Sequence, residues 1–101
     1  MAYTIIFDVQ RKQDLGHDEF VRRWLEHSGV AARLPGLRHY EILPVTGGDE
    51  GGPDGFVLMR FDSKEAADEA FASPVMAESS ADSAFFASAF GLFYVDSHRV
   101  V

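Results

Sequence analysis

The chain has 101 residues, 47% of them hydrophobic, and a formal net charge of −7 at pH 7. This length suits one domain with no second core, and the apolar content excludes a disordered tail. Residues 39–101 carry three Lys/Arg against eleven Asp/Glu, which excludes binding to a nucleic-acid backbone, because that needs clustered positive charge. We therefore expect a single domain over residues 1–101 that binds no nucleic acid.

The sequence contains no cysteine. This excludes disulfides and thiolate metal sites and is typical of proteins in a reducing compartment. The first residues lack the positively charged N-terminal region and the long apolar run that are typical of a signal peptide. No apolar run reaches the length of a membrane span. We expect a cytoplasmic protein with no membrane partner.

The first two elements are a strand and an amphipathic helix. Residues 3–10 alternate apolar and polar side chains, which predicts a strand. Residues 17–34 have the 3.6-residue period of a helix, and Pro35-Gly36 predicts its end. One narrow arc of this helix carries Phe20, Trp24, His27, Ala31 and Leu34. We expect this stripe to be buried, with a titratable ring at its centre.

The remaining elements follow from apolar patterns and turn residues. In chain order they are expected as a strand at 37–45, a flexible hairpin loop at 46–55, a short apolar strand at 56–61, a helix at 64–72, a further helical piece that starts at Ser73-Pro74 and includes 81–90, and a last strand at 92–101. The order is β-α-β-β-α-β, with a break near Pro74 in the second helical element.

That order predicts an α+β, ferredoxin-like fold, in which helices cover one face of a four-stranded antiparallel sheet. The strands offer apolar residues on both faces: Ile5 and Ile6 are neighbours in the first strand, as are Val57 and Leu58 in the third. So small a domain has too few helices to cover both faces. We therefore expect a homodimer formed through the second face of the sheet.

Two runs of residues resemble the EthD family. The first comprises Phe20, Trp24, His27, Ala31, Leu34-Pro35-Gly36-Leu37 and Tyr40; the second comprises Phe61-Asp62-Ser63, Glu65-Ala66, Ala70-Phe71, Ser73-Pro74, Asp82 and Phe85 or Phe86. The resemblance implies a dimeric α/β barrel, with a cleft between sheet and helices in each subunit. Related barrels include isomerases, polyketide cyclases, cofactor-free monooxygenases and haem-degrading enzymes.

His27 is the catalytic candidate, because imidazole titrates near neutrality and can accept or donate a proton in an apolar cleft. The alternative is a structural histidine bonded to the backbone. The expected substrate-binding residues are Phe20, Trp24, Tyr40, Asp82 and Phe86. The aromatic residues of this set could equally be ordinary hydrophobic-core residues that contact no ligand. Asp82, placed by the resemblance, could pair with His27 or Arg38, or be a surface carboxylate.

Other chemistries have weaker support. His17, His39 and His98 lack the spacing of metal ligands, so we expect no metal and no cofactor. Ser28 follows His27 but points about 100° away on a helix, which does not favour a serine hydrolase built on that pair. We expect a cofactor-free enzyme acting on a small hydrophobic molecule. A non-catalytic binding protein for such a ligand is the alternative, and haem binding is a third.

Overall fold

Four strands pair into one sheet; the first alternates apolar and polar residues, whereas the third is almost wholly apolar. The computed structural model, which describes residues 2–101, contains β1 (Tyr3–Arg11), β2 (His39–Pro44), β3 (Gly55–Phe61) and β4 (Ala87–Val95). Their order across the sheet is β2-β3-β1-β4, and each neighbouring pair is antiparallel. The predicted ferredoxin-like topology is confirmed.

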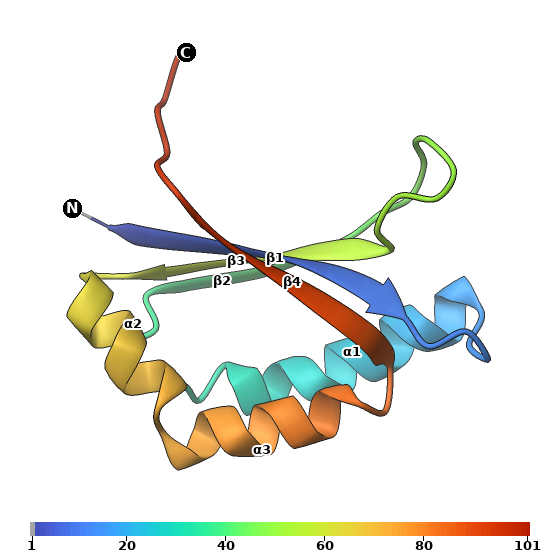
Figure 1. Ribbon diagram of the computed structural model, residues 1–101, viewed down its shortest axis with the longest axis horizontal. Coiled ribbons are helices and arrows are strands. Elements are labelled where there is room, and N and C mark those ends of the chain that lie inside the picture. The colour runs from blue at the N-terminus through green and yellow to red at the C-terminus, as the bar shows by residue number, and fades with distance from the viewer. Residues whose placement is uncertain (1) are drawn as a thin grey trace.

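Three helices, α1 (His17–Ala31), α2 (Lys64–Phe71) and α3 (Pro74–Ser83), lie together on one face of this sheet (Figure 1). The predicted break in the second helical element is present. There the Ser73 hydroxyl accepts a hydrogen bond from the backbone N–H of Met76, and Pro74 opens α3. The break lets α3 turn back and run beside α1, while the C-terminal end of the chain leaves on the opposite side of the sheet (Figure 1).

The predicted stripe of α1 is buried against the sheet. The exposed fraction is 0% for Phe20, 1% for Trp24 and 7% for His27, and Ala31 and Leu34 are buried beside them. Trp24 lies directly over Gly55 at the start of β3. A Cβ added at Gly55 would stand 2.4 Å from the indole ring, so only glycine fits beneath this tryptophan.

The predicted end of the first helix was three residues too late. α1 ends at Ala31, and the chain continues as a tighter turn in which Arg33 and Leu34 donate hydrogen bonds to carbonyls three residues earlier. Leu34 precedes a proline, which disfavours helical backbone at that position. Gly36 then adopts a φ of 75° that suits glycine. The second strand was likewise predicted too long, since it covers only His39–Pro44.

The C-terminal strand was placed too late in the sequence. Residues 87–90 were assigned to the last helical piece, but they belong to β4, which ends at Val95 rather than at residue 101. β4 pairs with β1 from Ala87 opposite Arg11 to Val95 opposite Thr4. The first and last residues of β4 are therefore set by the part of β1 with which it pairs. Phe90, expected on a helix, instead lies opposite Val9 in the sheet.

Two glycines provide a matched test of this packing. Gly55→Ala forces the indole of Trp24 to move, and we expect a loss of roughly 1–3 kcal/mol in the free energy of unfolding. Gly29→Ala lies inside α1, where an added Cβ meets nothing within 4 Å; we expect it to stabilise the protein by about 1 kcal/mol through helix propensity. Urea unfolding measures both. Equal effects of the two substitutions would contradict the close approach at Gly55.

Candidate functional site

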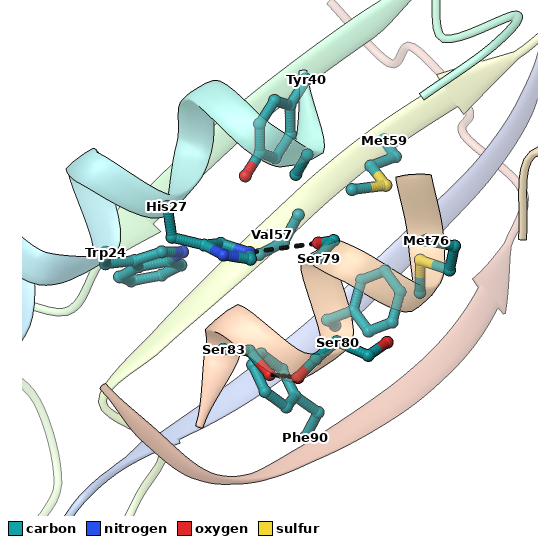
Figure 2. A pocket seen from close by; sticks show the side chains of 12 residues that line it. Trp24, His27, Tyr40, Val57, Met59, Met76, Ser79, Ser80, Ser83 and Phe90 are labelled. Carbon is teal, nitrogen blue, oxygen red and sulfur yellow. Dashed lines mark hydrogen bonds between the residues drawn. The ribbon is translucent and has the colours of Figure 1, made fainter. Parts of the chain in front are cut away.

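His27 lies at the middle of α1, and both of its ring nitrogens face α3. Its Nδ1 is 2.8 Å from a carboxylate oxygen of Asp82, and its Nε2 is 3.3 Å from the hydroxyl oxygen of Ser79. Figure 2 shows the imidazole reaching across to the Ser79 hydroxyl. Asp82 and Ser79 stand three positions apart in the helix, so one turn of α3 contacts the ring from both sides.

These partners define the hydrogen-bonding roles of the ring. A carboxylate only accepts hydrogen bonds, so Nδ1 carries the proton and its N–H donates a hydrogen bond to Asp82. In the neutral ring, Nε2 then has a free lone pair and can act as a base. This lone pair accepts a hydrogen bond from the Ser79 hydroxyl. The ring of Phe86 lies against the imidazole, with centroids 4.9 Å apart. His27 is therefore an oriented base and not a freely rotating side chain.

Two further contacts hold α3 in register along α1. Arg33, two residues past the end of α1, pairs with Glu78 in the middle of α3 at 2.5 Å. Just past the C-terminal end of α3, the carbonyl oxygen of Phe85 accepts a hydrogen bond from the guanidinium of Arg23 at 2.8 Å. The histidine contacts lie between these two.

A cavity of about 200 Å³ lies between the helices and the sheet, next to Nε2. It is lined by Phe7, Trp24, His27, Ala31, Tyr40, Val57, Met59, Met76, Ser79, Ser80, Ser83 and Phe90. Figure 2 shows the polar groups among these on α1, β2 and α3, while the walls from β3 and β4 are apolar. An apolar cavity of about 150 Å³ accepts a benzene ring, so this one can hold an aromatic ring with a short side chain.

Tyr40 contributes a hydroxyl to this cavity from β2. Its neighbour in the sheet is Met59, on the face that the helices cover. Burial raises the pKa of Tyr40 to about 12, so the phenol keeps its proton at neutral pH. Tyr40 lines the cavity, and Figure 2 shows its hydroxyl on the side of the ring that faces His27. It therefore serves as a donor open to the cavity.

The expected substrate-binding residues divide between three places. Trp24 and Tyr40 line the cavity. Asp82 and Phe86 line a second recess on the outer side of His27, together with Arg22, Arg23, Glu26, Val30 and Phe85. Phe20 is fully buried and lies against both Trp24 and Phe86, with ring centroids 5.3 and 6.1 Å away. His27 lines both the cavity and the outer recess.

The pairing left open for Asp82 is with His27, whereas Arg38 pairs with Asp62 at 2.9 Å. The sequence reasoning missed Ser79, although its spacing of three from Asp82 on one helix was visible in the sequence. Ser28 does point away from the ring, as expected: its hydroxyl donates to the carbonyl oxygen of Leu25.

Over positions 2–101, no cluster of three or more His, Asp or Glu side chains could hold a metal ion. Across that range no helix combines the length and the apolar character needed to cross a membrane.

Comparison with known proteins gives one family. The model of the EthD domain matches residues 12–89, which include His27 and its partners Ser79, Asp82 and Phe86. No curated protein matches the chain.

Solved structures of similar fold cover nearly the whole chain. An ethyl tert-butyl ether D (EthD) family protein from Bacillus halodurans is 20% identical, with a TM-score of 0.77 over 97% of this chain and 100% of that one. A DABB family protein from Mesorhizobium loti is 13% identical, with a TM-score of 0.77 over 97% and 98%. A dimeric ferredoxin-like protein from Thermobifida fusca is 17% identical, with a TM-score of 0.75 over 94% and 90%. These likenesses support the fold.

Alkaline titration tests the environment of Tyr40. Between about pH 10 and 12 the folded protein keeps the phenol proton that the unfolded chain releases. Its contribution to stability is therefore complete below pH 10 and is lost as the pH rises toward 12. We expect the absorbance at 295 nm to rise in a separate step near pH 12, when Tyr40 ionises, and we expect Tyr40→Phe to remove this step. Tyr94→Phe is the control, since that ring is exposed. A late step that survives in Tyr40→Phe would contradict the assignment.

Proposed function

Since this chain belongs to the EthD domain family, whose model matches residues 12–89, we propose that it is a cofactor-free enzyme that moves a proton on a small hydrophobic or aromatic substrate. One observation carries the proposal: an imidazole with a fixed tautomer opens onto an apolar cavity that also holds a protonated tyrosine. A base and a hydrogen-bond donor around one apolar space are what enolate-type chemistry requires.

In the proposed step, His27 Nε2 accepts a proton from a carbon next to a carbonyl group. The hydroxyl of Tyr40 donates a hydrogen bond to the carbonyl oxygen as negative charge develops there. Asp82 stabilises the imidazolium that forms, through the proton on Nδ1. The contact from Ser79 to Nε2 is long, at 3.3 Å, so a bound substrate can displace it. Return of the proton to another atom completes an isomerisation. Bond formation between the enolate carbon and a second carbonyl carbon of the same substrate, followed by protonation of the resulting alkoxide, gives cyclisation. Oxygenation requires dioxygen as a co-substrate that takes up electrons from the enolate.

The second candidate function is a non-catalytic binding protein that holds a small apolar ligand in the same cavity. The mostly apolar lining supports it equally well. The two functions differ in whether His27 exchanges protons with the bound molecule.

Proton transfer is tested by deuterium exchange into a simple aryl ketone, propiophenone, in D2O, followed by loss of the α-proton signal in the NMR spectrum. We expect the protein to accelerate exchange, and His27→Ala to lower the rate by about 10²-fold or more, because a positioned base is removed. Tyr40→Phe and Asp82→Asn should lower it less. His39→Ala is the matched control, since this histidine pairs with Glu41 outside the cavity.

Binding of the ketone is measured alongside by its effect on Trp24 fluorescence. Affinity that persists in His27→Ala while exchange is lost supports the enzyme. Binding without any acceleration of exchange in the unaltered protein supports the non-catalytic alternative.

We also propose that two copies associate through the uncovered face of the sheet. Ile6 lies between Leu58 of β3 and Phe93 of β4 in the strand register, so the three form an apolar row on the side away from the helices. Phe93 is 52% exposed, and Leu43 on β2, which lies opposite Phe56 and not in the row itself, is 41% exposed. The β2 residue opposite Leu58 is Glu41, so the apolar row ends at β3. An apolar patch on a sheet that helices cover on one side only favours self-association, and the structural relative from Thermobifida fusca is described as dimeric.

Sedimentation velocity tests this association. We expect the unaltered protein to sediment with the mass of two chains and Leu58→Glu to sediment as one chain, because the substitution buries a charge in the interface. Leu25→Glu is the matched control: this leucine is 55% exposed on α1, on the far side of the molecule from the row, and the variant should stay dimeric. A single-chain mass for the unaltered protein overturns the proposal.

A further inference from the structure

The contacts around His27 contain a second chemical possibility that proton transfer does not use. Ser79 Oγ is 3.3 Å from Nε2, and Asp82 is 2.8 Å from Nδ1 on the opposite side of the ring. A hydroxyl on Nε2 and a carboxylate on Nδ1 are the arrangement that activates a serine as a nucleophile. Such a set is recognised by geometry and not by sequence order.

We propose that Ser79 is a nucleophile and that the cavity cleaves small apolar esters through an acyl-serine intermediate. Ser79 Oγ forms a bond to the ester carbonyl carbon as its proton passes to His27 Nε2. The imidazolium then protonates the departing alcohol oxygen as the ester C–O bond breaks. A water molecule adds to the acyl carbon, losing its proton to Nε2, and expulsion of Oγ with return of that proton releases the carboxylic acid and restores Ser79.

The surroundings of Ser79 suit this chemistry. Ser79 is 7% exposed, yet it lines the cavity together with Met76, Met59 and Val57, so an acyl group held against these apolar walls can place its carbonyl carbon next to Oγ. Asp82 lies on the outer recess, away from the substrate, where its charge does not oppose the attack.

The donor for the developing oxyanion is the hydroxyl of Tyr40. Ser79 lies inside α3 (Pro74–Ser83), so its backbone N–H belongs to the helical ladder and cannot stabilise the oxyanion. Tyr40 faces the same cavity with its proton retained, and Figure 2 shows its hydroxyl directed toward the space beside His27 and Ser79. With one side-chain donor, turnover is expected to be slow. The covalent adduct is therefore the better measurement.

The first experiment treats the full chain with diisopropyl fluorophosphate and locates the adduct by peptide mass spectrometry. We expect a single phosphoryl adduct on Ser79. His27→Gln should slow its formation by about 10²-fold or more, because the general base is lost, and Ser79→Ala should abolish it. Ser28→Ala is the control that should keep full labelling, since this serine follows His27 in sequence but bonds to the carbonyl of Leu25. Circular dichroism of each variant establishes that it is folded.

A second variant keeps the test independent of the reactivity of one reagent. Because the chain contains no cysteine, Ser79→Cys introduces a single thiol. We expect iodoacetamide to alkylate it at least about tenfold faster than in the double variant Ser79→Cys/His27→Gln, because the imidazole promotes the thiolate.

The outcomes separate this inference from proton transfer. The assignment of Ser79 as a nucleophile is overturned if the adduct is spread over several serines. It is also overturned if the rates of adduct formation and of alkylation do not depend on His27. In either case Ser79 is a structural contact between helices. Ketone exchange without an adduct on Ser79 overturns this inference alone. A His27-dependent adduct without ketone exchange supports it and removes the proposed proton transfer.

Discussion

The imidazole of His27 joins two helices by satisfying both of its nitrogens on one turn of α3. A buried polar group left without a partner costs about 1–3 kcal/mol, so the register of α3 along α1 is tightly specified. Sliding α3 by one residue removes the carboxylate and the hydroxyl from the ring together. The flanking contacts of Arg33 with Glu78 and of Arg23 with the Phe85 carbonyl fix the same register. The position of the cavity wall that α3 supplies follows from these contacts.

The sequence predicted the layers of the fold well because its signals there are local. The stripe from Phe20 to Leu34 and the break at Pro74 depend on helix period and on proline chemistry, which a single sequence displays. The bounds of β4 depend instead on its partner β1, a long-range pairing that the alanine- and phenylalanine-rich segment does not encode by itself. The late placement of that strand reflects this difference.

Part of the lining of the candidate cavity follows from local patterns. His27 stands out in the sequence because a titratable ring on an apolar helix stripe is unusual, and Trp24 shares that stripe; both line the cavity, as does Tyr40. Their convergence with Ser79 was not predicted, since that requires the packing of α3 on α1. The tautomer of His27 likewise depends on Asp82, which could be located in sequence but not oriented. Tertiary packing therefore decides which polar residues act together.

The close approach of Trp24 to Gly55 has a consequence for how the cavity can change. Trp24 is a wall of the cavity, and the absence of a side chain at Gly55 makes room for its ring. The two positions form one steric unit: a larger residue at 55 is compatible only with a smaller one at 24. A change at this pair also reaches the base, because Trp24 stacks on Phe86 with ring centroids 6.2 Å apart and Phe86 lies against the His27 ring. The size of the cavity and the orientation of its base are thus linked through residues far apart in the sequence.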